Sequence, residues 1–371
     1  MADETPDPTR VPGAPHPRDT TQLIGQDKAE AAFLDAFTTG RLHHAWLITG
    51  PRGVGKATLA WRIARFLLAT PDPDPDDMFG APFPTVLDVS PDHPIARRIT
   101  ANAEPGLKSV HRTENEKTKR LRDQITIDDI RALSGFFQLS ATDGGRRVVI
   151  IDAADDMNVN AANALLKMLE EPPARTTLLL ICHQPSRLLP TIRSRCRTLR
   201  LGPLDAAQMG TAMANAGVDP GPDGAALAEL SAGSVGEAMR LSLLDGLKTY
   251  TEVVALLDTM PNLDRARALA LAEAAGARGA EVKLDLLYTL IDVALSRLAR
   301  TGAGHPPTVE AARNEAAIFA RLCASQGHAR AWADTAQTAL ARARHGRAVN
   351  LDPPALVLDT LFKLSATAPP R

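Results

Sequence analysis

Cysteine, aromatic residues and long apolar runs are all scarce in this sequence. The three cysteines, Cys182, Cys196 and Cys323, are too scattered for a disulfide framework or a CxxC metal site, so reduced thiols are expected. No apolar run approaches the roughly 20 residues that span a bilayer, and no signal peptide is recognisable. We therefore expect a cytoplasmic protein without membrane contact.

The sequence also lacks a surplus of either charge. Lysine and arginine total 42 against 43 aspartates and glutamates, which gives a net charge of -1. A global field that would attract DNA is therefore absent. Basic residues do gather between positions 108 and 122, where we expect a solvated face, with direct DNA contact as the less favoured alternative.

The length of 371 residues predicts two or three domains. A proline-rich lead at 1–19 is expected to be disordered, and a second proline-rich segment at 71–77 predicts a surface insertion. Apolar runs alternate with helical patterns up to residue 203, which predicts an α/β domain with a parallel sheet covered on both faces. Alanine- and leucine-rich helical patterns follow, which we divide into a small domain at 204–245 and a larger one at 246–371. The expected strands are 46–49, 85–90, 147–152, 177–182 and 198–201; the expected helices of the α/β domain are 26–39, 57–69, 126–139 and 160–171.

The segment GPRGVGKAT at positions 50–58 is close to the phosphate-binding pattern G-x-x-x-x-G-K-[S/T]. Its glycines allow successive backbone N–H groups to face phosphates, and its lysine supplies positive charge. The position that should carry a hydroxyl for Mg²⁺ is Ala57, and Thr58 comes one residue late, a helical rotation of about 100°. The candidate nucleotide-binding residues, including the aspartate considered next, are Gly50, Gly53, Val54, Gly55, Lys56, Ala57, Thr58 and Asp152.

The run RVVIID at 147–152 ends in a carboxylate where a nucleotide site would place its Mg²⁺-orienting group. Ala153 stands where a glutamate would position the attacking water, and Asp155 would need a different backbone path to replace it. Asp152 has two interpretations, a vestigial metal ligand or a residue that only ends the strand. The phosphate loop upstream favours the first.

The motif NALLKMLEEPP at 163–173, followed by Ser194-Arg195-Cys196, is the most specific signal in the chain. Together with Ile24-Gly25-Gln26 and HAWLITGPRG, it resembles the clamp-loader branch of the AAA+ ATPases. The resemblance implies an AAA+ α/β domain, a helical lid and a helical collar domain that assembles the ring. It also implies that Arg195 acts in trans as an arginine finger on ATP held by a neighbouring subunit. The alternative is an ordinary surface arginine beside Arg193, Arg197 and Arg200.

The sequence departs from active members of this branch at further points. Gly236 stands where a sensor arginine would follow Gly233-Ser234, and positions 70–110 lack the four cysteines of a zinc module. With Ala57 and Ala153, these departures favour a subunit that is not catalytic alone and needs no cofactor or zinc, although ATP or ADP binding stays open.

The resemblance implies a place in the clamp loader of a bacterial replicative DNA polymerase holoenzyme. The expected partners are the tau/gamma and delta subunits, with the sliding clamp and primed DNA reached through the complex. Two rival hypotheses remain, a weakly active ATPase motor and a nucleotide-binding adaptor outside replication.

Overall fold

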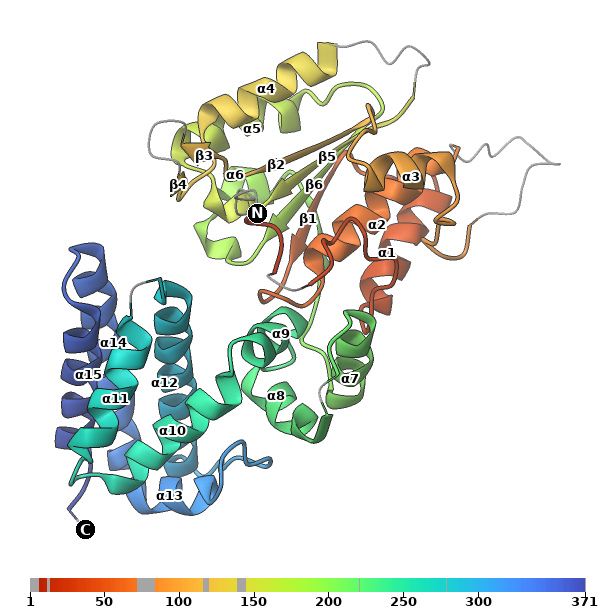
Figure 1. The fold of residues 1–371 in the computed structure, drawn as a ribbon. Helices are drawn as coiled ribbons and strands as arrows, with labels where there is room; N and C mark the ends of the chain where they lie inside the picture. Colours follow the sequence, from red (N-terminus) through yellow and green to blue (C-terminus); the bar gives the residue numbers. More distant parts are fainter. Residues whose placement is uncertain are drawn as a thin grey trace. The chain divides into compact units, whose positions relative to one another are not determined.

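The chain forms two compact units in a computed structural model, which describes residues 7–11, 14–71, 84–115, 120–138, 145–219, 221–277 and 279–370. The first unit comprises Met1–Val218 with Gly233–Glu237, and the second comprises Asp219–Ala232 with Ala238–Arg371. The first is an α/β unit and the second is helical (Figure 1). The fold class predicted from the sequence is therefore confirmed, whereas the predicted domain boundaries at 203 and 245 stay predictions.

A five-stranded parallel sheet in the order β2-β5-β6-β1-β7 organises the first unit. Its central strands are almost wholly apolar because helices cover both faces of a parallel sheet. Leu47 lies beside Leu180, which fixes the register of β1 against β6. The strands are β1 (Ala45–Thr49), β2 (Leu107–His111), β5 (Arg147–Asp152), β6 (Thr176–Cys182) and β7 (Arg197–Arg200), and a separate antiparallel pair is formed by β3 (Glu114–Asn115) and β4 (Arg120–Leu121).

Helices cover the two faces of this sheet (Figure 1). On one side lie α1 (Asp27–Thr38), α2 (Lys56–Ala69) and α3 (Pro94–Thr100); on the other lie α4 (Ile127–Gln138), α5 (Val159–Glu170) and α6 (Pro190–Arg193). Helix α7 (Ala206–Asn215) follows β7. Leu165 of α5 and Ile130 of α4 are completely buried in the core beneath the second face. This packing holds α4 and α5 against the sheet and so supports the loops that follow the strands.

The helical unit has its own buried core and a buried charge network. Glu315 is 0% exposed, and it accepts hydrogen bonds from Tyr250 and from Arg297, each at 2.7 Å. None of the helices in the described ranges has the length and apolar composition needed to cross a membrane. The helices are α8 (Gly224–Leu230), α9 (Val235–Leu243, which begins in the first unit), α10 (Gly246–Thr259), α11 (Arg265–Gly276), α12 (Glu281–Gly302), α13 (Glu315–Leu322), α14 (Gln326–Ala348) and α15 (Pro353–Thr367).

Two predictions from the sequence are wrong. Residues 85–90 form no strand, and the edge position is taken instead by β2, in a polar stretch where only Val110 is buried. An edge strand needs few apolar residues because one side faces solvent, which is why its pattern is weak. Residues 7–11 and 14–19 are not a disordered lead: the His16 ring packs edge-on against Trp61 of α2 at 5.7 Å. Positions 72–77 of the predicted insertion, together with Lys117 and Lys119, lie outside the described residues.

Candidate functional site

The phosphate loop connects β1 to α2, as the sequence predicts. Gly53 and Gly55 have φ angles of +74° and +96°, a conformation that side chains other than glycine rarely adopt. Gly55 directly precedes the first turn of α2, and Lys56 is the first helical residue. The loop therefore has the backbone of a phosphate site at a helix N-terminus.

The Lys56 side chain is turned into this loop. Its ammonium donates hydrogen bonds to the carbonyl oxygens of Gly50, at 2.8 Å, and Pro51. The residue is only 3% exposed, and this burial lowers the pKa of Lys56 to about 8, against an opposing attraction from Asp152. A phosphate entering the loop would have to compete with two backbone carbonyls for this lysine.

The Gly233–Glu237 segment packs directly onto the loop. The backbone N–H of Gly236 donates to the Gly53 carbonyl at 3.1 Å. A Cβ atom added to Gly236 would lie 3.0 Å from the Gly53 Cα, and one added to Gly53 would collide with Ser234. Glycine at 236, where the resemblance would place a sensor arginine, is thus favoured by the close approach of the two backbones.

Asp152 lies at the carboxyl end of β5, beside Ile181 of β6 in the sheet register. Burial raises the pKa of Asp152 to about 7, although the Lys56 ammonium works in the opposite direction. The structure therefore brings Lys56 and Asp152 together electrostatically, as in a nucleotide site. The neighbouring Ala153 has no side chain that could position a water.

Asp155 does not replace the missing water-positioning carboxylate. Its two oxygens accept backbone hydrogen bonds from His183 and Gln184, each at 3.0 Å, at the end of β6. Burial alone would raise the pKa of Asp155, but these hydrogen bonds lower it below its ordinary value. Both carboxylate oxygens therefore accept hydrogen bonds that hold the turn after β6.

Arg195 lies just after α6, and its side chain is 36% exposed. Its guanidinium donates to the Thr191 carbonyl at 3.0 Å and forms an ion pair with Glu170 at 2.8 Å. The sequence does not single out Glu170 as a functional candidate, although this residue is part of the LEEPP motif at the end of α5. Only the fold brings the two motifs together.

A hollow of about 450 Å³ lies beside the Ser194-Arg195-Cys196 segment. Its lining includes Ser194, Arg193 and Arg200, and both arginines are exposed. Arg197 lies over the Trp46 ring at 5.1 Å. The surface that carries Arg195 is therefore basic and accessible in this chain.

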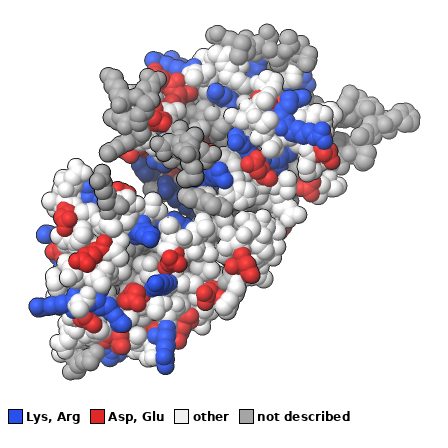
Figure 2. Space-filling model, viewed as in Figure 1, with Lys and Arg blue, Asp and Glu red and all other residues white. Residues whose placement is uncertain are grey.

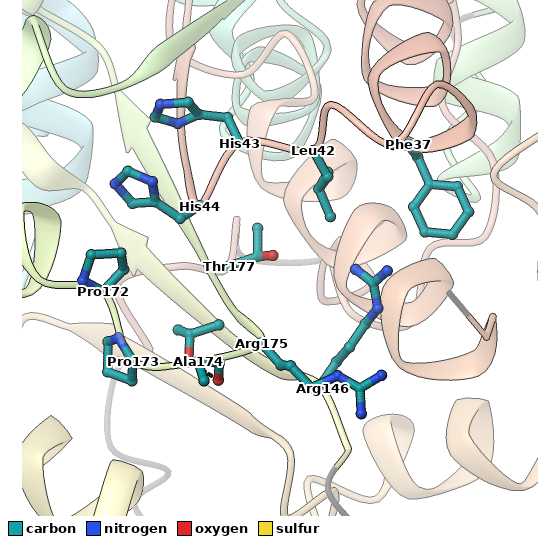
Figure 3. A pocket seen from close by; sticks show the side chains of 12 residues that line it. Phe37, Leu42, His43, His44, Arg146, Pro172, Pro173, Ala174, Arg175 and Thr177 are labelled. Atoms are coloured by element: carbon teal, nitrogen blue, oxygen red, sulfur yellow. Dashed lines mark hydrogen bonds between the residues drawn. The ribbon is translucent and has the colours of Figure 1, made fainter. Parts of the chain in front are cut away.

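A second cavity, of about 470 Å³, lies at the amino ends of β1, β5 and β6 (Figure 3). His43 and His44 stack there with ring centroids 4.3 Å apart, and Arg146 lies over the Phe37 ring at 5.1 Å. Burial and the neighbouring His43 lower the pKa of His44. Because the phosphate loop follows the carboxyl end of β1, this cavity takes no part in the nucleotide site.

The basic stretch from 108 to 122 is partly engaged within the chain. Arg112 forms an ion pair with Asp156 at 3.3 Å, and Arg122 donates to the Thr113 hydroxyl at 3.3 Å. On the face shown in Figure 2, basic and acidic side chains are interspersed. Within the described ranges, no group of three or more His, Cys, Asp or Glu residues is arranged to hold a metal ion.

Comparisons with known proteins show the family of this chain. The family described as "DNA polymerase III, delta subunit" matches residues 25–205. The DNA polymerase III subunit delta' of Escherichia coli K12 is 32% identical over 264 residues, which cover 71% of this chain and 72% of that protein. The delta' subunit of Pseudomonas aeruginosa is 42% identical over 153 residues, 41% of each protein.

More distant similarities extend to related subunits. The tau subunit of Salmonella typhimurium is 30% identical over 199 residues, which cover 52% of this chain and 27% of tau. The match thus spans less than half the length of the P. aeruginosa and S. typhimurium relatives. A solved gamma subunit-related protein from Thermotoga maritima is 16% identical, with a TM-score of 0.42 over 92% of this chain and 99% of its own, too distant to carry an argument.

Proposed function

The chain belongs to the DNA polymerase III subunit delta' family, and from this premise we propose that it is a non-hydrolysing clamp-loader subunit that donates Arg195 to a neighbour. The proposed partners are the tau/gamma and delta subunits, which together load a sliding clamp onto primed DNA. The helical unit would supply the collar contacts that assemble the ring. One observation carries the proposal: the Lys56 ammonium is hydrogen-bonded to carbonyl oxygens of its own phosphate loop, whereas the side chain of the SRC arginine is accessible.

Several features of the phosphate loop argue against hydrolysis in this chain. Ala57 lacks the hydroxyl that holds Mg²⁺, and Ala153 lacks the carboxylate that positions water. Gly236 lacks the positively charged side chain of a sensor arginine. Phosphoryl transfer depends almost wholly on positioned charge, so each loss lowers the rate by orders of magnitude. In addition, Lys56 is engaged with Gly50 and Pro51. We propose that ATP, ADP and zinc are not required for the role of this subunit.

The accessible Arg195 supports a role in a neighbour's site. An arginine supplied in trans to a γ-phosphate accelerates hydrolysis by roughly 10³ to 10⁵. A chain that hydrolyses nothing can therefore still control the rate of the complex. The similarity to tau keeps a weak motor as the alternative, but an ATPase motor would need the groups that are replaced here.

The test is a reconstituted clamp loader that carries Arg195→Ala. We expect assembly to be unchanged while DNA-stimulated ATPase and clamp loading fall by about tenfold or more, because one site loses its finger. Arg187→Ala, which removes an exposed arginine after β6, is the matched control and should leave both activities unchanged. Normal loading by the Arg195→Ala complex would refute the finger role.

A further inference from the structure

Both terminal nitrogens of the Arg195 guanidinium are engaged within its own chain. Nη2 lies 2.8 Å from a Glu170 carboxylate oxygen, and Nη1 donates to the Thr191 carbonyl at 3.0 Å. Arginine binds a phosphate most strongly when two N–H groups are directed at it in parallel. The finger is thus engaged by groups of its own chain although its side chain is partly exposed.

We propose that Glu170 is a built-in competitor for the SRC arginine, so that Arg195 is released only to an anion that binds it better than a single carboxylate does. The proposal rests on the finger role proposed above, and it adds a regulatory contact to that site. The γ-phosphate of ATP meets the requirement because it offers several charged oxygens at once. ADP ends one phosphate earlier and competes less well.

The exposure of the ion pair sets the size of this effect. The Glu170 side chain is 50% exposed and that of Arg195 is 36% exposed, so water screens their attraction. Exposed pairs of this kind shift an equilibrium by only about two- to fivefold. This is weak enough for ATP to displace Glu170, yet large enough to weaken the binding of ATP at a shared site. A glutamine at position 170 keeps the size and shape of the side chain but removes its charge, so it isolates the electrostatic part.

The chain offers a matched control in the next residue. Glu171 is also exposed and belongs to the same LEEPP motif, and its backbone N–H closes the last turn of α5 on the Lys167 carbonyl. Glu171→Gln removes the same charge from the same surface, one position away from the ion pair. A nonspecific effect of surface charge would appear in both variants.

The experiment uses reconstituted loaders containing the full chain with Glu170→Gln, Glu171→Gln, Arg195→Ala or the Glu170→Gln/Arg195→Ala pair. We expect Glu170→Gln to lower the ATP concentration for half-maximal clamp loading by about two- to fivefold, to change ADP inhibition less than this and to leave the maximal rate unchanged. Glu171→Gln should match the wild type. The double variant should match Arg195→Ala, because no guanidinium remains to be released.

The outcomes separate the two proposals. A lower maximal rate with an unchanged ATP requirement would mean that Glu170 aims the finger instead of restraining it, and would overturn the competitor role. No effect of Glu170→Gln, in a loader that Arg195→Ala does impair, would also overturn it while leaving the finger role intact. If Arg195→Ala itself has no effect, both proposals are wrong.

Discussion

Asp152 offers the sharpest test of the electrostatics of the phosphate site. Burial raises the pKa of its carboxyl from 3.8 to about 7, even though the Lys56 ammonium opposes the shift. Between these two values the folded protein binds more protons at this residue than the unfolded chain does. The free energy of unfolding that Asp152 contributes therefore falls as pH rises through this window.

The substitution Asp152→Asn removes this titration while preserving the size of the side chain. Each pH unit inside the window corresponds to about 1.4 kcal/mol per group. Between pH 5 and pH 7, the variant should therefore become more stable relative to the wild type by about 2 to 3 kcal/mol. The prediction concerns this pH-dependent difference, because removing the charge also changes the environment of Lys56.

Urea denaturation of the full chain at pH 5, 6 and 7 measures this difference. Tryptophan fluorescence is a suitable signal because Trp46 and Trp61 lie in the same unit as Asp152. A stability difference that stays constant across this range would refute the raised pKa, and with it the view that this carboxylate is held in a desolvated site. A difference of the opposite sign would do the same.

Asp155→Asn is the control with the opposite expectation. The hydrogen bonds from His183 and Gln184 lower the pKa of Asp155, so its contribution to stability is present above the unfolded value and is lost as pH falls. The variant should therefore show a constant loss of stability relative to the wild type between pH 5 and pH 7, and this loss should shrink only below about pH 4. The two neighbouring aspartates thus predict stability changes in different pH windows and of opposite sign.

Two further predictions concern hydrolysis and the helical unit. The purified chain should show no ATP turnover that is sensitive to Lys56→Ala, with or without DNA, because the groups that hold Mg²⁺ and water are replaced; Lys56-dependent turnover would favour the motor alternative. Glu315→Ala should lower the stability of the helical unit by about 1 to 3 kcal/mol, because Tyr250 and Arg297 lose a buried hydrogen-bond partner while Arg297 keeps its ion pair with Glu229. A change in melting temperature smaller than a few degrees would contradict that reasoning.

The sequence predicted the central strands well because buried parallel strands consist almost entirely of apolar residues. Strands β1, β5 and β6 are short apolar runs, and each is followed by a loop with glycine, aspartate or polar residues. Strand β2 could not be found in this way, since its exposed Lys108 and partly buried neighbours resemble a loop. Residues 85–90 include Val86, Leu87 and Val89, yet they pair with no strand in the described residues.

The candidate site was predictable in its residues but not in its contacts. The phosphate loop, Asp152 and Arg195 follow from motifs. The engagement of Lys56 by Gly50 and of Arg195 by Glu170 depends on side-chain directions that no spacing encodes. Glu170 lies 25 positions before Arg195, and only the packing of α5 with α6 brings them together.

The altered positions around the phosphate loop depend on one another. An arginine at position 236 would place its Cβ 3.0 Å from the Gly53 Cα, so restoring it would require the Gly233–Glu237 segment or the loop to shift by a few tenths of an ångström. Restoring a hydroxyl at Ala57 alone would leave the Lys56 ammonium on the Gly50 and Pro51 carbonyls. No single substitution reverses both contacts. We therefore infer that the loop is retained as packing for the α/β unit, while Arg195, whose ion pair with Glu170 and hydrogen bond to Thr191 are exposed to solvent, can be released to another subunit.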